Sequence, residues 1–292
     1  MKPAPFDYFA PTELQEALML LERHKDEAKI LAGGQSLLPL LNMRLARPKA
    51  IIDINRITSL SYIHKDNGSL RIGGLTRHRM IESSAVIQEQ CPLMTEAIQW
   101  VGHIEVRNRG TIGGSLVHAD PAAELPTVVT ALGGEMKLVG PRGDRTVRPE
   151  EFFVSFLTTA LDSSEILAEV RLPIWPRPTG YSFQEISRRH GDFAVVAVAV
   201  LLLLNDKGEC KNSSIVLAGV GPTPLKAKRS EGLLMGKKVT RELMEKAGGL
   251  AAEDSDPSSD VHGSADYRRE MVKVMTRRAL EEALAKAMQN AK

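Results

Sequence analysis

Cysteine is scarce in this 292-residue chain, which contains only Cys91 and Cys210. The two lie far apart and form no CxxC pair, so a disulfide framework is excluded. An iron–sulfur cluster bound by this chain alone is also excluded, since such clusters usually need four thiolates. The seven histidines are scattered, and none forms a pair at metal-ligand spacing. Low cysteine usage is typical of a reducing compartment, and we expect a cytoplasmic location.

The chain has little excess charge and no long apolar run. Its formal net charge of +2 gives no reason to expect a nucleic acid or an anionic membrane as partner. The N-terminus lacks the apolar stretch of a signal peptide. The longest apolar run, Ala194 to Leu204, is too short to span a bilayer as a helix, so no transmembrane segment is expected. Its Val and Leu content predicts a buried strand that ends in a hairpin turn at residues 205–208.

Phosphate-binding motifs of the common kinds are absent, because the chain has neither a P-loop nor a GxGxxG fingerprint. It has instead two Gly-Gly segments, 32–36 (AGGQS) and 111–115 (TIGGS), and each is expected to be a loop at the end of an apolar strand. Paired glycines allow close approach of a ligand, and successive backbone N–H groups form a seat for an anion. Two such seats predict a pyrophosphate held from both sides, as in a bound dinucleotide; ordinary tight turns are the alternative.

The pattern of apolar runs, turns and prolines predicts an α+β chain in three parts. Residues 1–57 form a small α/β lobe, and residues 58–175 a larger lobe of mixed strands and helices. The prolines at 173, 176 and 178 mark a boundary. Residues 176–292 are expected to form an α+β domain, with a three-stranded antiparallel sheet followed by helices.

Several segments resemble the FAD-binding medium subunits of the molybdenum hydroxylases. They are Leu31–Pro39, Val106–Ser115 with the following His118-Ala119-Asp120-Pro121, Ser187–Ala194 and His262–Arg269. The resemblance is stronger to the medium subunit of aerobic carbon monoxide dehydrogenase than to the flavin domain of xanthine dehydrogenase. It covers nearly the whole chain and implies the two-lobed FAD-binding fold.

The resemblance also implies which residues bind FAD. The pyrophosphate is expected between two segments, whose residues are Ala32, Gly33, Gly34, Gln35, Ser36 and Leu37 in the first and Thr111, Ile112, Gly113, Gly114 and Ser115 in the second. Arg107 and Arg109 flank the second segment, either adding positive potential there or forming surface ion pairs.

Three further residues are assigned by the resemblance. Glu124 is expected near ribityl or ribose hydroxyls, unless it is only a first-turn acid favoured by the helix dipole. Phe193 is expected against the isoalloxazine ring, the alternative being an ordinary core Phe. Gln184 stands where the xanthine dehydrogenase type has a lysine near the flavin, and this difference weakens the case for NAD as electron acceptor.

The function implied is electron transfer without a catalytic acid or base from this chain. The expected partners are a small subunit with two [2Fe-2S] clusters and a large molybdopterin subunit, usually as a dimer of heterotrimers. The alternatives are a self-contained FAD-dependent oxidoreductase of the same fold type and a nucleotide-binding accessory protein for cofactor assembly. The substrate of the complex and the terminal acceptor stay open.

Overall fold

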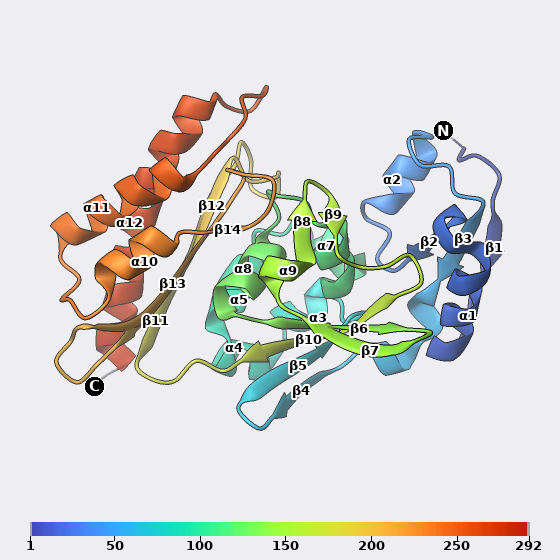
Figure 1. Cartoon of the computed structure of the whole chain (residues 1–292), viewed down its shortest axis with the longest axis horizontal. Helices are drawn as coiled ribbons and strands as arrows, with labels where there is room; N and C mark the ends of the chain where they lie inside the picture. Colours follow the sequence, from blue (N-terminus) through green and yellow to red (C-terminus); the bar gives the residue numbers. More distant parts are fainter. Residues whose placement is uncertain (1, 291–292) are drawn as a thin grey trace.

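The computed structural model describes residues 2–290 in three parts, which follow one another along the long axis of the molecule (Figure 1). The N-terminal part lies at one end, the C-terminal part at the other, and the five-stranded sheet with its helices between them. No helix among the described residues combines the length and the apolar character that crossing a membrane would require.

The first part is a small parallel sheet with one main covering helix. Strand β3 is central and pairs in parallel with β1 and β2. Ala17, Leu18 and Leu21 form the buried face of α1, as their spacing predicts, although the helix is capped by Glu13 without a side-chain hydrogen bond. The elements are β1 (Asp7–Phe9), α1 (Leu14–His24), η1 (Lys25–Glu27), β2 (Ala28–Leu31), α2 (Leu37–Asn42), β3 (Ala50–Asp53), η2 (Ile54–Arg56) and η3 (Thr58–Leu60).

The second part is an antiparallel sheet in the order β4-β5-β10-β6-β7, with helices on one face. Its apolar core lies between Leu70, Ile72 and Val170 of the sheet and Leu125 and Val128 of α8. The elements are β4 (Ile63–Asp66), β5 (Ser69–Gly73), α3 (His78–Glu82), α4 (Ala85–Gln90), α5 (Pro92–Ile98), α6 (Ile104–Arg109), α7 (Ile112–His118), α8 (Glu124–Leu132), β6 (Glu135–Gly140), β7 (Gly143–Val147), α9 (Pro149–Phe152), β8 (Phe153–Ser155), β9 (Thr158–Thr159) and β10 (Ile166–Pro173).

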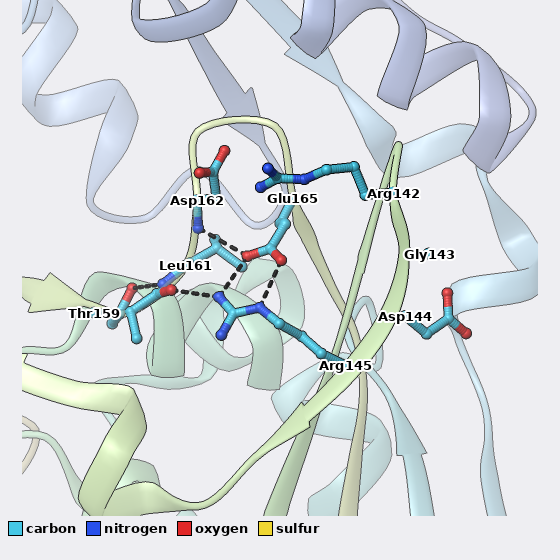
Figure 2. Close-up of a pocket in the computed structure, with 9 residues that line it drawn as sticks. Arg142, Gly143, Asp144, Arg145, Thr159, Leu161, Asp162 and Glu165 are labelled. Carbon is cyan, nitrogen blue, oxygen red and sulfur yellow. Dashed lines mark hydrogen bonds and ion pairs between the residues drawn. The ribbon is translucent and has the colours of Figure 1, made fainter.

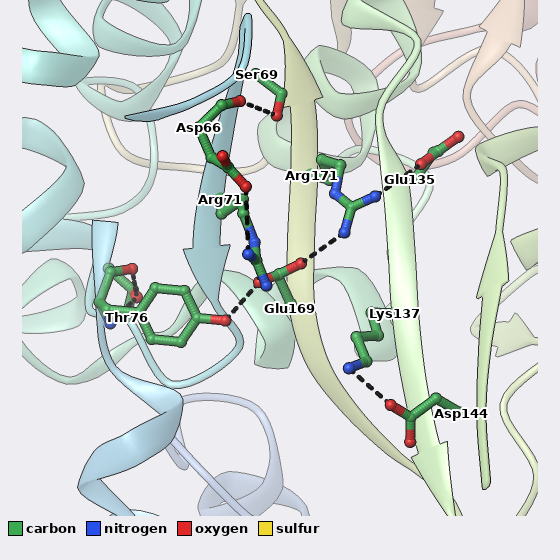
Figure 3. A network of polar contacts seen from close by, with 10 residues as sticks. Asp66, Ser69, Arg71, Thr76, Glu135, Lys137, Asp144, Glu169 and Arg171 are labelled. Atoms are coloured by element: carbon green, nitrogen blue, oxygen red, sulfur yellow. Dashed lines mark hydrogen bonds and ion pairs between the residues drawn. The ribbon is translucent and has the colours of Figure 1, made fainter. Parts of the chain in front are cut away.

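The other face of this sheet carries a polar network (Figure 3). The carboxylate of Glu169 lies between Arg71 and Arg171, and it accepts hydrogen bonds from Tyr62 Oη at 2.6 Å and Arg71 Nε at 2.7 Å. Burial alone would raise the pKa of Glu169, but these hydrogen bonds outweigh it and hold the pKa below its usual value. The network therefore satisfies its own charges and stabilises the sheet.

The third part is an antiparallel sheet with α12 and α10 against one face, and α11 packs on these two helices. It has four strands and not the expected three, because Leu225 and Lys226 add a short β14 beside β13. This strand follows a proline-rich turn and is only two residues long, so the sequence gives it almost no signal. The elements are β11 (Thr179–Ile186), β12 (Val196–Leu204), β13 (Cys210–Ala218), β14 (Leu225–Lys226), α10 (Lys228–Leu234), α11 (Arg241–Asp254) and α12 (Ala265–Asn290).

Strand β12 explains the apolar run and is buried along its whole length. Val196, Val198 and Val200 face the core under α11 and α12, whereas Ala197 and Ala199 face the helices of the second part. A strand covered on both faces has no polar side, which confirms the predicted buried strand. The predicted turn follows it, with Gly208 at φ +73°.

Candidate functional site

The first glycine segment connects β2 to α2 and needs both glycines, for different reasons. A Cβ on Gly33 would lie 2.7 Å from the carbonyl oxygen of Arg109 and 2.8 Å from the Cα of Gly110. Gly34 has φ +74°, a conformation that side chains other than glycine rarely adopt. The first segment is thus packed backbone to backbone against the chain that leads into the second.

The first segment presents unused hydrogen-bond donors. Within residues 2–290, the backbone N–H groups of Gly33, Gly34, Gln35 and Ser36 donate to no protein acceptor. Ser36 precedes α2 as its N-cap, but its hydroxyl makes no capping hydrogen bond. Backbone N–H groups in a fold are almost always paired with protein, water or ligand, so this run of donors is suited to an anion.

The second glycine segment differs from the expectation. It follows helix α6 and not a strand, and Gly113 and Gly114 form the first turn of α7 with Thr111 as N-cap. Its backbone N–H groups are already used: Ile112 donates to Thr76 O, Gly113 to Gly74 O, Gly114 to Thr111 Oγ1 and Ser115 to Thr111 O. The expected second seat of free amides is therefore not present.

The second segment contributes space instead. A Cβ on Gly113 would lie 2.6 Å from Gly74 O, so this glycine lets α7 pack against the sheet. At Gly114 only Thr111 Oγ1 lies within 4 Å of the Cβ position, and the position is otherwise open. A ligand held by the first segment can thus approach the start of α7 closely, where a side chain at residue 114 would intrude.

Glu124 lies at the first turn of α8, and the structure places a second acid near it. Glu124 is 8% exposed, and burial raises its pKa to about 7 with a smaller contribution from Asp120. Glu185 on β11 is also buried, and neither of its carboxyl oxygens has a hydrogen-bond partner in the described chain. Burial and the nearby Glu124 raise the pKa of Glu185 to about 9, so this carboxyl is protonated at neutral pH.

The structure does not bring Gln184 to these acids. Its side chain lies on the α12 side of β11, where Nε2 donates to Glu282 Oε2 at 2.6 Å and Ser182 Oγ at 3.3 Å. Neighbouring side chains of a strand point to opposite faces, so Glu185, and not Gln184, faces α8. The sequence did not single out Glu185. The only signal in the sequence is that Glu185 shares one face of β11 with Phe183, a large apolar residue, at the alternating spacing of a strand.

Phe193 is 70% exposed, which excludes the core interpretation. Its loop connects β11 to β12 and is anchored on the second part of the molecule. The rings of Trp100 and His190 stack with centroids 5.2 Å apart. A Cβ on Gly191 would lie 2.6 Å from the ring of His103, so this turn packs tightly as well. The loop is thus held in place while it presents an aromatic ring to solvent.

The two flanking arginines have different environments. Arg107 is mostly buried, pairs with Glu82 at 3.2 Å and donates to the carbonyl oxygens of Val101 and Gly102. It therefore supports the chain before the second segment. Arg109 is exposed and forms no ion pair within residues 2–290.

A pocket of about 440 Å³ lies elsewhere, and all its lining residues come from 142–165 (Figure 2). Figure 2 shows the guanidinium of Arg145 turned toward Glu165, with two contacts of 2.7 Å. These charges neutralise each other, and none of the candidate residues lines this pocket.

Comparison with known proteins finds two family models that together match most of the chain. The model for the "FAD binding domain in molybdopterin dehydrogenase" matches residues 4–175, and the model for the "CO dehydrogenase flavoprotein C-terminal domain" matches residues 181–283. The chain is 40% identical to 6-hydroxypseudooxynicotine dehydrogenase complex subunit alpha of Paenarthrobacter nicotinovorans, over 98% of this chain and 97% of that protein. It is 40% identical to caffeine dehydrogenase subunit beta of Pseudomonas sp. (strain CBB1), over 97% and 96%.

The fold agrees with a solved structure. Superposition on a chain of carbon monoxide dehydrogenase from Hydrogenophaga pseudoflava gives a TM-score of 0.96 at 37% identity, covering 98% of this chain and 100% of that chain. This chain therefore belongs to the family of FAD-binding medium subunits of molybdenum hydroxylases, to which the carbon monoxide dehydrogenase medium chain also belongs.

Proposed function

We propose that the chain holds the FAD diphosphate between residues 32–37 and the start of α7. The observation that carries this proposal is the run of four unused backbone donors from Gly33 to Ser36, packed against the chain before the second segment. Ala32 and Leu37 bound the run, and Thr111, Ile112, Gly113, Gly114 and Ser115 form the opposite wall. Successive unused backbone N–H donors suit phosphate oxygens, and the open position at Gly114 leaves room for the phosphate groups.

The remaining candidate residues serve the other parts of the cofactor. Glu124 is proposed to accept hydrogen bonds from ribityl or ribose hydroxyls, a role that suits a carboxylate away from the phosphates. Phe193 is proposed to cover the isoalloxazine ring and exclude water from one face. Bound FAD supplies reversible uptake and release of one or two electrons; this chain contributes binding, orientation and protection. Gln184 stays a prediction that depends on the resemblance alone.

We propose that electrons reach this chain from a partner subunit that carries [2Fe-2S] clusters, and that substrate is oxidised at molybdopterin in a large subunit. The names of two relatives, a "complex subunit alpha" and a "medium chain", support membership of a multi-subunit assembly. Assembly as a dimer of heterotrimers and a cytoplasmic location stay predictions.

The direct test is FAD binding by the purified full chain and by a Gly34→Val variant. Wild-type chain is expected to bind one FAD and to turn yellow. Valine at the φ of Gly34 is strained and meets Leu31 and Leu38, so the variant is expected to lose FAD while keeping its far-UV circular dichroism. Equilibrium dialysis with FAD measures the difference.

The control is Gly208→Val. Gly208 has nearly the same φ, +73°, with nothing within 4 Å of its Cβ position, and it lies in a turn outside the candidate site. This variant carries a similar backbone strain and is expected to retain FAD. Equal FAD binding by Gly34→Val and wild type would refute the proposed seat.

A further inference from the structure

Asn55 connects the first glycine segment to the end of the parallel sheet. It lies in η2, two residues after β3 ends, and its side-chain Nδ2 donates to Ala32 O at 2.8 Å. Asp53 Oδ1 accepts from both the backbone N (2.9 Å) and Nδ2 (2.6 Å) of Asn55, which fixes the amide orientation. The side-chain oxygen of Asn55 is thereby turned toward the second part of the molecule.

Arg77 meets Asn55 from the other side. It precedes α3, and its guanidinium donates through one nitrogen to Asn55 Oδ1 at 2.5 Å and through another to the carbonyl oxygen of Arg109. Its backbone also forms an isolated antiparallel bridge with Thr111. One planar side chain therefore joins the residue that holds Ala32 to the chain that leads into the second glycine segment.

The carbonyl oxygen of Arg109 is the common contact point. It accepts from Arg77 and also lies 2.7 Å from where a Cβ on Gly33 would be. The two glycine segments thus meet at a contact with no spare room, and the guanidinium of Arg77 fixes its geometry. A shift of either segment would break a hydrogen bond or create a clash.

The charge of Arg77 is not neutralised by this arrangement. Both acceptors are uncharged oxygens, and among residues 2–290 no carboxylate forms an ion pair with Arg77. Asp53 is the acid whose negative charge acts on Arg77, but its carboxylate accepts hydrogen bonds from Tyr8 Oη at 2.6 Å and from Asn55 Nδ2 instead. A partly buried cation without a counter-ion beside a predicted diphosphate site is consistent with an anionic ligand there.

We propose that Arg77, oriented by Asn55, is a positioning residue for the dinucleotide, which sets the separation of the two segments that hold its diphosphate. This inference rests on the proposed function. Arg77 acts through Ala32, Gly33 and Arg109, and needs no contact with the cofactor. The planar guanidinium group with its several N–H donors is essential, because one side chain must reach both Asn55 Oδ1 and Arg109 O, which lie on different parts of the molecule.

The test compares Arg77→Met, Arg77→Lys and the control Arg79→Met in the full chain, with FAD and with ADP as ligands. Loss of hydrogen bonds from a charged donor is expected to weaken the binding of both ligands by about 10- to 100-fold in Arg77→Met. Arg77→Lys keeps the charge but cannot reach both oxygens, and is expected to stay at least about tenfold weaker than wild type. Arg79, exposed and paired with Glu82, should tolerate replacement.

A double-mutant cycle with Asn55→Leu tests whether the two residues act together. Asn55→Leu with Arg77→Met is expected to bind FAD no more weakly than Arg77→Met alone, because both changes break the same connection. The absorption spectrum of the bound flavin should stay unchanged, since the ring is not affected. Thermal unfolding without FAD shows whether each variant is folded.

Three results would overturn the proposal: Arg77→Met binding FAD within twofold of wild type, wild-type affinity in Arg77→Lys, or fully additive effects in the cycle. Failure of the wild-type chain to bind FAD would instead refute the proposed function, so the two are distinguishable.

Discussion

At the scale of single residues, Glu185 and Arg77 are two polar residues whose roles the sequence pattern does not indicate. Glu185 occurs in a strand of mixed polar and apolar residues, and Arg77 occurs in a basic stretch before a short helix. Their roles depend on what faces them. Glu185 faces Glu124 with no hydrogen-bond partner among the described residues, and Arg77 faces two carbonyl oxygens from different parts of the chain.

Glu185 gives a pH-dependent prediction for stability. Its carboxyl ionises near pH 4.5 in the unfolded chain but only near 9 in the folded chain, because burial disfavours the charge. Between these values the folded state binds the additional proton, so the free energy of unfolding falls as pH rises. Glu185→Gln removes this pH-dependent contribution to the free energy of unfolding. The variant is therefore expected to gain stability relative to wild type between pH 5 and pH 8, measured by urea unfolding without FAD.

Glu242→Gln provides the comparison for this experiment. Glu242 is exposed and its hydrogen bond with Lys246 lowers its pKa, so its replacement should not reproduce the effect. A stability difference between Glu185→Gln and wild type that is the same at pH 5 and pH 8 would contradict the assignment of a protonated Glu185.

At the scale of elements, the third part depends on the close approach of α12 to the sheet. A Cβ on Gly180 of β11 would lie 1.7 Å from Ala283 O and 2.6 Å from Ala287 N, both backbone atoms of α12. The helix therefore packs on this strand without an intervening side chain. Alanine residues at 279, 283 and 287 continue the same close face. The sequence predicts both elements, but not their separation.

Gly180→Ala is expected to destabilise the chain because a helix backbone must move to accept one methyl group. Overpacking of this kind costs about 1–3 kcal/mol, and a backbone contact belongs at the upper end of that range. Gly232→Ala in α10, with nothing within 4 Å of the added Cβ, is expected to stabilise by about 0.5–1 kcal/mol. Urea unfolding at one pH compares the two variants, and equal effects would show that α12 is less closely packed than described.

At the scale of the whole molecule, the three parts share their cores. Phe183 and Ala199 of the third part are buried in the same cluster as Val128 of the second. Ile166 and Ala168 of the second part belong to the cluster beneath α1 of the first. Linear boundaries near 57 and 175 separate the sheets along the chain, yet the apolar contacts cross both boundaries.

Shared cores predict that residues 1–177 alone do not behave as an intact FAD-binding unit. Removal of the third part exposes the apolar faces of α5 and α8, which pack on its sheet in the full chain. The fragment is expected to aggregate or bind a hydrophobic dye, and to retain FAD poorly, when compared with the full chain by size-exclusion chromatography. A monomeric fragment with the FAD affinity of the full chain would show that the shared core is dispensable.

Local patterns in the sequence determined the apolar strand β12, the buried face of α1, the α+β class and the first glycine segment, because each depends on residues within a few positions of one another. Tertiary packing decided the rest. It made Gly113 and Gly114 part of a helix whose amides are occupied, turned Gln184 toward α12 and Glu185 toward Glu124, and brought Asn55, Arg77 and Arg109 together from separate stretches of chain. These outcomes depend on which distant surfaces meet, and the periodicity of a single segment contains no information about its partner.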